Sequence, residues 1–196
     1  MGSQAEVCYF AYGSNMDPIE FRKCIGGRKH GLEVQQNDIY RAPGELKGWK
    51  IYFCHADDCY PEDEDVDVWA ADPNLTGICS ISRDTSSTVY GVVYWVEGNV
   101  FDTLDKHEGT TYSREKLKVQ TTIKEKTLGV GEPENSKFIE TSRKSGEVEC
   151  WVYVGHSERQ ETHRKPTKRY MDMLLAGADC LPNRYVEMLR QVETLH

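Results

Sequence analysis

The sequence lacks both long hydrophobic runs and an excess of positive charge. No apolar stretch among its 196 residues approaches the roughly 18 that a membrane-spanning helix needs. Residues 1–9 do not place a basic region ahead of an apolar one, so we expect no secretory signal. The formal net charge of −8 would repel nucleic-acid phosphates and anionic membrane surfaces. We therefore expect neither a membrane partner nor a nucleic-acid partner.

The sequence also has no CxxC pair, although it contains seven cysteines. They are scattered along the chain at Cys8, Cys24, Cys54, Cys59, Cys79, Cys150 and Cys180. Conserved-looking spacings of an even number of cysteines in a secreted chain would have indicated a disulfide framework. The odd count and the scattered spacing favour reduced thiols in a cytoplasmic protein.

Internal repeats and low-complexity tracts are absent as well. The hydrophobic content of 38% and the aromatic content of 10% are those of a globular chain rather than a disordered one. The length fits one domain over residues 1–196. Because predicted strands and helices are mixed without regular βαβ alternation, we expect a mixed α+β domain rather than a doubly wound sheet.

Hydrophobic patterning predicts the positions of most elements. Strands are expected at residues 7–12, 49–53, 76–82, 88–96, 112–122 and 148–154. Helices are expected at about 100–108, 166–176 and 182–192, with Gly109 ending the first and Gly177 capping the second. The acidic stretch 57–67 reads as a solvated loop, and the polar stretch 124–146 as a long loop or a protruding hairpin.

The strand at 7–12 ends in a turn that carries Gly13, Ser14 and Asn15. Asp17, Pro18 and Glu20 follow as N-cap, first and third positions of a helix. A strand, a glycine turn and a helix start in sequence direct free backbone N–H groups at one point, which suits an anion or a carbonyl oxygen. By pattern alone, the same residues also fit an ordinary strand-to-helix connection.

Glu108 lies on the apolar face of the helix predicted at 100–108, in register with Phe101 and Leu104. Burial and the negative end of the helix dipole both disfavour the ionised carboxylate, so its pKa should be raised. Such a group can act as a general base and then as a general acid. The alternative is that Glu108 reaches solvent past Gly109 at the end of the helix.

Several segments together resemble the gamma-glutamylcyclotransferase family. Residues 9–15, YFAYGSN, look like the family's signature, residues 90–94 resemble its central strand, and residues 104–109 resemble the segment ending in its catalytic glutamate, here Glu108. Tyr112 and Tyr170 fall where the family has tyrosines near the substrate. The resemblance implies a partly barrel-like mixed sheet flanked by helices. It also implies no metal and no organic cofactor, and it admits a homodimer.

The implied reaction is the cyclisation of a gamma-glutamyl amide to 5-oxoproline with release of an amine or amino acid. Glu108 would move the proton, and backbone N–H groups around Gly13 and Ser14 would bind the substrate α-carboxylate or the developing oxyanion. Tyr12 would shape the pocket and Tyr170 would supply a hydroxyl. The full substrate-binding set implied is Tyr9, Phe10, Ala11, Tyr12, Gly13, Ser14, Asn15, Tyr112 and Tyr170. Asn15 stands where glutathione-specific members of the family usually have leucine, which favours gamma-glutamyl amino acids or amines as substrates.

Three other interpretations remain open at this point. A cysteine hydrolase would use Cys54 with His55 or His107, although adjacent residues on a strand point to opposite faces. A metal site would use His55, Asp57, Asp58 and Cys59, whose spacing matches neither a zinc site nor an EF-hand. A catalytically silent binding module would keep the fold and hold a ligand or partner, and a fully exposed Glu108 far from the turn would favour it.

Overall fold

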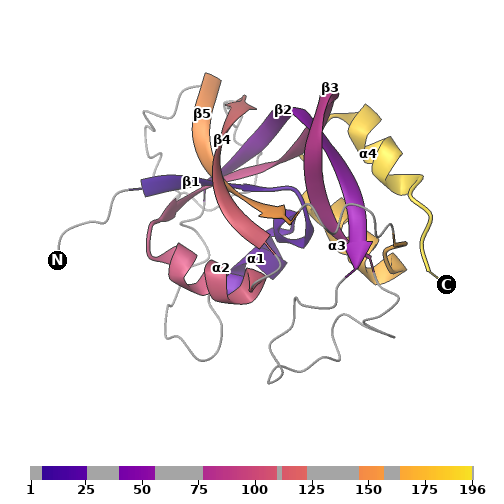
Figure 1. Ribbon diagram of the computed structural model, residues 1–196, viewed down its shortest axis with the longest axis horizontal. Helices are drawn as coiled ribbons and strands as arrows, with labels where there is room; N and C mark the ends of the chain where they lie inside the picture. The colour runs from indigo at the N-terminus through magenta and orange to yellow at the C-terminus, as the bar shows by residue number, and fades with distance from the viewer. Residues whose placement is uncertain are drawn as a thin grey trace, which may run out of the picture.

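Five strands close into a barrel in the computed structural model, which describes residues 6–25, 40–55, 77–109, 112–122, 146–156 and 164–195. The strands are β1 (Glu6–Ala11), β2 (Tyr40–His55), β3 (Gly77–Glu97), β4 (Tyr112–Thr121) and β5 (Gly146–Gly155), in the order β1-β3-β2-β4-β5 around the barrel (Figure 1). Neighbouring strands run antiparallel, except that β5 returns to β1 in a parallel pairing. The expected mixed α+β domain with a barrel-like sheet is therefore confirmed.

The helices are η1 (Ser14–Met16), α1 (Pro18–Ile25), α2 (Val100–Glu108), α3 (Lys168–Gly177) and α4 (Asn183–Arg190). Local signals place two of these boundaries correctly. Asp17 Oδ1 accepts the Ile19 amide at 2.8 Å, which confirms Asp17 as the N-cap of α1. Gly109 has a φ of 58° and its amide bonds the Asp105 carbonyl, so it ends α2 as predicted.

The prediction of two strands at 76–82 and 88–96 was wrong, because both belong to the single strand β3. The strand continues through a polar stretch whose two ends pair with β2, at Trp49↔Arg83 and at Lys47↔Thr88. The register shifts between Lys47 and Trp49, where Gly48 has a φ of 80°. β2 is likewise much longer than the predicted 49–53.

Gly177 has a role different from the predicted cap, because it is the last residue of α3 and Ala178 follows as the cap. A Cβ at Gly177 would lie 2.1 Å from the Met16 carbonyl carbon. Glycine is required here because α3 packs directly against the backbone that follows the Gly13–Asn15 turn. This contact brings the late helix to the N-terminal turn.

Aromatic rings hold β1, β3 and α1 together. The rings of Phe21 and Tyr94 stack with centroids 4.3 Å apart, and Tyr9 stacks on Phe21 at 5.5 Å. The Tyr94 hydroxyl donates to the Met16 carbonyl at 2.9 Å. This packing fixes the end of β1 and the turn after it relative to the rest of the barrel.

Some predicted features cannot be compared with the structure. The loops at 57–67 and 124–146 lie outside the described residues. Within the described ranges, the helices are all too short or too polar to cross a bilayer.

Candidate active site

The turn after β1 and the end of α2 meet through the side chain of Asn15. Its Nδ2 donates to Glu108 Oε1 at 3.2 Å and to the Tyr9 hydroxyl at 3.1 Å. Asn15 is 7% exposed, so a polar side chain is held inside the protein by these two partners. The structure thus brings together three of the predicted site residues, from segments that the sequence places far apart.

Glu108 has the electrostatic character predicted for it. Its pKa is raised to about 7, first by burial of the carboxyl group and then by the negative charge of Asp105 one helical turn earlier. The side chain as a whole is partly exposed, because only its carboxyl end turns toward Asn15. A carboxyl group near half-ionisation at neutral pH can accept and return a proton.

Asp105 interacts electrostatically with this carboxyl group and itself contacts Tyr153 and Arg114, and none of the three was predicted. The Tyr153 hydroxyl donates to Asp105 Oδ1 at 2.6 Å, and the Arg114 guanidinium lies 3.1 Å from Asp105 Oδ2. Tyr12 joins the same group, because its hydroxyl donates to the Tyr153 carbonyl at 2.5 Å. The position of Asp105 three residues before Glu108 on one helix was the only sequence signal for any of these contacts.

Cys79 of β3 connects the two later tyrosines to the turn. The Tyr112 hydroxyl donates to the Cys79 carbonyl at 2.8 Å, and the Cys79 amide donates to the Tyr170 hydroxyl at 3.0 Å. The Cys79 thiol lies 3.7 Å from the Tyr12 carbonyl as a weak donor. Tyr112 and Tyr170 are therefore close together, as the resemblance implies, although the residue that connects them had no motif.

Gly13 lies directly against this group. A Cβ at Gly13 would be 3.3 Å from the Tyr170 hydroxyl and 3.5 Å from the Cys79 Cβ. The next hydrogen bonds run from the Met16 amide to the Gly13 carbonyl and from the Asp17 amide to the Ser14 carbonyl. These bonds form the short 3-10 helix η1, so the turn leads into η1 and not directly into α1 as predicted. They do not use the amides of Gly13, Ser14 and Asn15.

Phe10 and Ala11 belong to the buried core of the barrel. The Phe10 ring is fully buried, and it fills the space that Cβ atoms at Gly44 and Gly91 would occupy. The Ala11 carbonyl would lie 2.2 Å from a Cβ on Gly91, so β1 and β3 approach closely here. Both residues therefore anchor the start of the turn in the barrel core.

The competing sites find little support in the described residues. Cys54 is fully buried on β2, and His107 is exposed on α2. Asp57, Asp58, Cys59 and the His55 side chain lie outside the description. Among the residues that are described, no group of three or more metal-binding side chains gathers. None of the described cysteines, which exclude Cys59, is in a disulfide.

The family described as "Gamma-glutamyl cyclotransferase, AIG2-like" matches residues 9–172. The chain belongs to this family. The match begins at Tyr9 and includes the turn, Glu108, Tyr112 and Tyr170. The family membership therefore covers all the residues that form the candidate site.

Solved structures of gamma-glutamyl cyclotransferases share the fold. One described as "Gamma-glutamyl cyclotransferase" has a TM-score of 0.68 at 20% identity, covering 97% of this chain and 90% of its own. An uncharacterised protein from Homo sapiens has a TM-score of 0.66 at 20% identity, with 97% and 89% covered. A yeast gamma-glutamyl cyclotransferase specific to glutathione has a TM-score of 0.56 at 12% identity, with 94% of each chain covered. No curated protein sequence matches the chain significantly.

Proposed function

We propose that the protein is a gamma-glutamylcyclotransferase that converts gamma-glutamyl amino acids or amines to 5-oxoproline and releases the free amino acid or amine. The observation that carries this proposal is the Glu108 carboxyl group, which has a pKa near 7 and is hydrogen-bonded to the buried Asn15 of the turn. A proton-transfer group is thereby held next to a segment suited to binding an anion.

The proposed reaction is an intramolecular acyl transfer. Glu108 takes a proton from the substrate's α-ammonium group, and the resulting amine attacks the γ-carbonyl carbon. The tetrahedral intermediate then collapses, and Glu108 returns the proton to the departing nitrogen. The second proton lost by the ring nitrogen, and the one that completes the released ammonium, exchange with solvent. Because nucleophile and electrophile belong to one molecule, a site that holds the chain curled removes much of the entropic barrier.

The turn supplies the proposed anion site. The amides of Gly13, Ser14 and Asn15 lie outside the hydrogen bonds of η1 and would bind the substrate α-carboxylate or the developing oxyanion. Tyr112 and Tyr170, joined through Cys79, would form the wall of the site facing Gly13. Tyr9 and Tyr12 would hold Asn15 and Tyr153 in place, while Phe10 and Ala11 would support the turn from inside the barrel.

A catalytically silent binding module is the second candidate. An exposed Glu108 far from the turn would favour this candidate. Instead, the Glu108 carboxyl oxygen lies 3.2 Å from the Asn15 side-chain nitrogen. A glutathione-directed enzyme is a narrower variant of the same chemistry. The yeast protein of similar fold is specific to glutathione, so glutathione belongs among the substrates tested.

The test is an assay for 5-oxoproline after incubation with gamma-glutamyl amino acids, gamma-glutamyl-lysine and glutathione. We expect product from the first group, and no product from any substrate would overturn the enzyme assignment. Glu108→Gln should keep the fold and lose activity by about 100-fold or more, the range typical of a missing general base. Glu97→Gln, at the exposed end of β3, is the matched control and should leave activity unchanged.

A further inference from the structure

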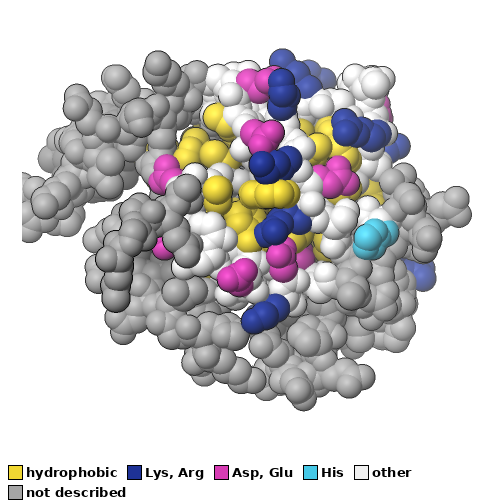
Figure 2. Space-filling view, turned by 60° about the vertical axis from the view of Figure 1, so that its left-hand side comes forward, with side chains coloured by type: hydrophobic (Ala, Val, Ile, Leu, Met, Phe, Trp, Pro, Cys, Tyr) yellow, Lys and Arg dark blue, Asp and Glu magenta, His cyan; other side chains and the backbone are white. Residues whose placement is uncertain are grey.

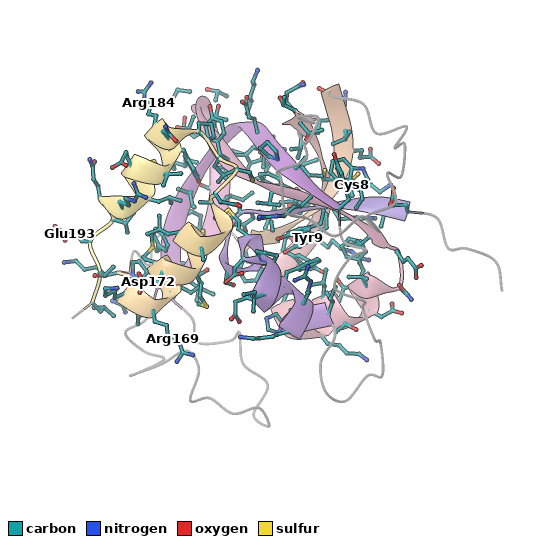
Figure 3. All side chains as sticks on the ribbon, turned by 180° about the vertical axis from the view of Figure 1, so that it is seen from behind. Cys8, Tyr9, Arg169, Asp172, Arg184 and Glu193 are labelled. Carbon is teal, nitrogen blue, oxygen red and sulfur yellow. The ribbon has the colours of Figure 1, made fainter. Side chains whose placement is uncertain are left out.

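The barrel closes where β1 meets β5, and the described part of this seam is short. It comprises two register pairs, Cys8↔Cys150 and Tyr9↔Trp151. The adjoining β4–β5 ladder runs much further, from Tyr112↔Gly155 to Thr121↔Gly146. Two cysteines are therefore partners at the parallel junction that completes the barrel, and Figure 3 shows Cys8 on β1 at this junction, one residue before Tyr9.

The two thiols interact directly. Neither is in a disulfide, and a hydrogen bond between the side chains of Cys8 and Cys150, together with burial, raises the pKa of Cys150. Registered residues on neighbouring strands lie roughly 4.8 Å apart, within the Cα separation of about 4.4–6.8 Å that a disulfide spans. Joining the sulfurs therefore needs side-chain rotation and not the movement of a strand.

Small molecules can reach Cys8 of this pair from one side. Cys8 and Cys150 line a shallow hollow on the barrel surface together with Glu6, Val7, Lys116, Glu149 and Trp151. Figure 2 shows a face of the molecule on which basic and acidic side chains alternate around hydrophobic ones, and the Lys116–Glu149 ion pair at 2.9 Å forms one wall of the hollow. Cys8 is partly exposed and Cys150 is buried, so a reagent meets Cys8 first.

We propose that Cys8 and Cys150 form a redox-active pair, which a small-molecule disulfide oxidises to an intramolecular disulfide across the β1–β5 seam. The Cys8 thiolate attacks one sulfur of the reagent and releases its first thiolate, leaving a mixed disulfide on Cys8. The mixed disulfide removes the Cys8 thiol, which is the first cause of the raised pKa of Cys150. Cys150 then loses its proton to solvent, and its sulfur attacks the Cys8 sulfur and releases the second thiolate. Two protein thiols are oxidised, and the reagent disulfide is reduced to two thiols.

The expected consequence is a stapled barrel. The bond would enclose the chain between positions 8 and 150, about 140 residues, and constrain the unfolded state more than the folded one. It would act at a seam that has only two described register pairs. We expect the melting temperature to rise by about 5 °C or more on oxidation and to return on reduction. This inference does not depend on the proposed enzymatic function.

The experiment treats the purified full-length chain with oxidised glutathione, then compares intact mass, tryptic peptides and melting temperature with the reduced protein. Trypsin places the two cysteines in separate peptides, residues 1–22 and 145–159, each with no other cysteine. The proposal expects a loss of two hydrogens, a cross-link between these peptides and a reversible rise in melting temperature. A stable glutathione adduct on Cys8, a cross-link between other cysteines, or no oxidation would each overturn it.

Matched variants separate the pair from the other thiols. Cys8→Ser removes the more accessible sulfur with little change in volume and should abolish both the cross-link and the rise in melting temperature. Cys180→Ser changes a partly buried cysteine away from the seam and should leave both unchanged. If Cys8→Ser still shows the oxidation-dependent rise, the stabilisation arises elsewhere and the proposal fails.

Discussion

Asn15 and Glu108 are 93 residues apart in the chain, yet the Asn15 side-chain amide donates to the Glu108 carboxyl oxygen at 3.2 Å. The same nitrogen donates to the Tyr9 hydroxyl. One buried amide thus orients the carboxyl group and joins it to the turn proposed to bind the substrate. Under the proposed function, Asn15 would position Glu108, and the effect of its removal can be measured.

Asn15→Ala should lower kcat/KM by about 10-fold or more, since a lost hydrogen bond to a charged group costs roughly 1.5–3 kcal/mol. The mutation also leaves the Tyr9 hydroxyl without its donor. Steady-state kinetics with the best gamma-glutamyl substrate provide the measurement, with circular dichroism to verify folding. A folded variant with wild-type kinetics would show that Asn15 does not position Glu108.

The pH dependence of activity should follow Glu108. Because the carboxyl group must be ionised to accept the first proton, kcat/KM should rise with pH through about 7, the pKa of Glu108. Measuring kcat/KM over roughly two pH units on either side of this pKa tests the assignment. An acidic limb centred near the ordinary carboxyl value would contradict the assignment.

The stability of the fold should also depend on the ionisation of Glu108, but it should fall as the pH rises. The pKa of Glu108 is raised in the folded protein from 4.5 to about 7, so protonation favours folding. This stabilisation is fully present below the pKa of Glu108 in the unfolded state, and it is lost as the pH rises through the pKa in the folded state. Relative to Glu108→Gln, the wild type should lose about 1–2 kcal/mol of unfolding free energy between pH 4.5 and 7, allowing for solvent screening. Urea titrations of both proteins at several pH values would measure this difference in unfolding free energy. A difference that does not change with pH would contradict the prediction.

Asp105→Asn should lower the pKa of Glu108, because the Asp105 charge is the second cause of its elevation. The acidic limb of the pH–kcat/KM profile should move to lower pH by a fraction of a unit. Asp102→Asn provides a control on the same helix at an exposed position. An equal shift in both variants would indicate a general charge effect and not the local contact.

Gly177→Ala should destabilise the protein, because its Cβ would meet the Met16 backbone, which cannot yield as a side chain can. Overpacking of this kind costs about 1–3 kcal/mol, or a fall of several degrees in melting temperature. Gly98→Ala is the matched control, since a Cβ there would meet nothing within 4 Å. Equal melting temperatures for the two variants would refute the close approach of α3 to η1.

Local chemistry made parts of the fold predictable. The Asp17 cap, the stop at Gly109 and the apolar face of α2 each depend on neighbours within one or two turns, and each is confirmed. The continuity of β3 was missed because the two ends of its polar middle, Arg83 and Thr88, pair with β2, which is distant in sequence. The role of Gly177 was predicted wrongly for a similar reason, because the backbone that it packs against belongs to Met16, far earlier in the chain.

In the candidate site, too, features set by local sequence were predictable and contacts between distant segments were not. Periodicity alone made Glu108 a candidate with a raised pKa, while the resemblance to a family joined it to the turn. Cys79 could not be predicted as the connection between Tyr112 and Tyr170, because both tyrosines bond its backbone and any residue type has the same amide and carbonyl. Tyr153 contacts Tyr12 through its carbonyl in the same way.

The parallel pairing of β1 with β5 also has a consequence during synthesis. The barrel strand β1 finds its parallel partner only when Gly146–Gly155, more than a hundred residues later in the chain, has emerged from the ribosome. Until then β1 lacks one neighbour, and Tyr170 of α3 emerges later still. Pairings so distant in sequence slow folding. A nascent chain stopped before β5 should therefore present an open strand edge to chaperones, and it should acquire a closed site only after α3 has been made.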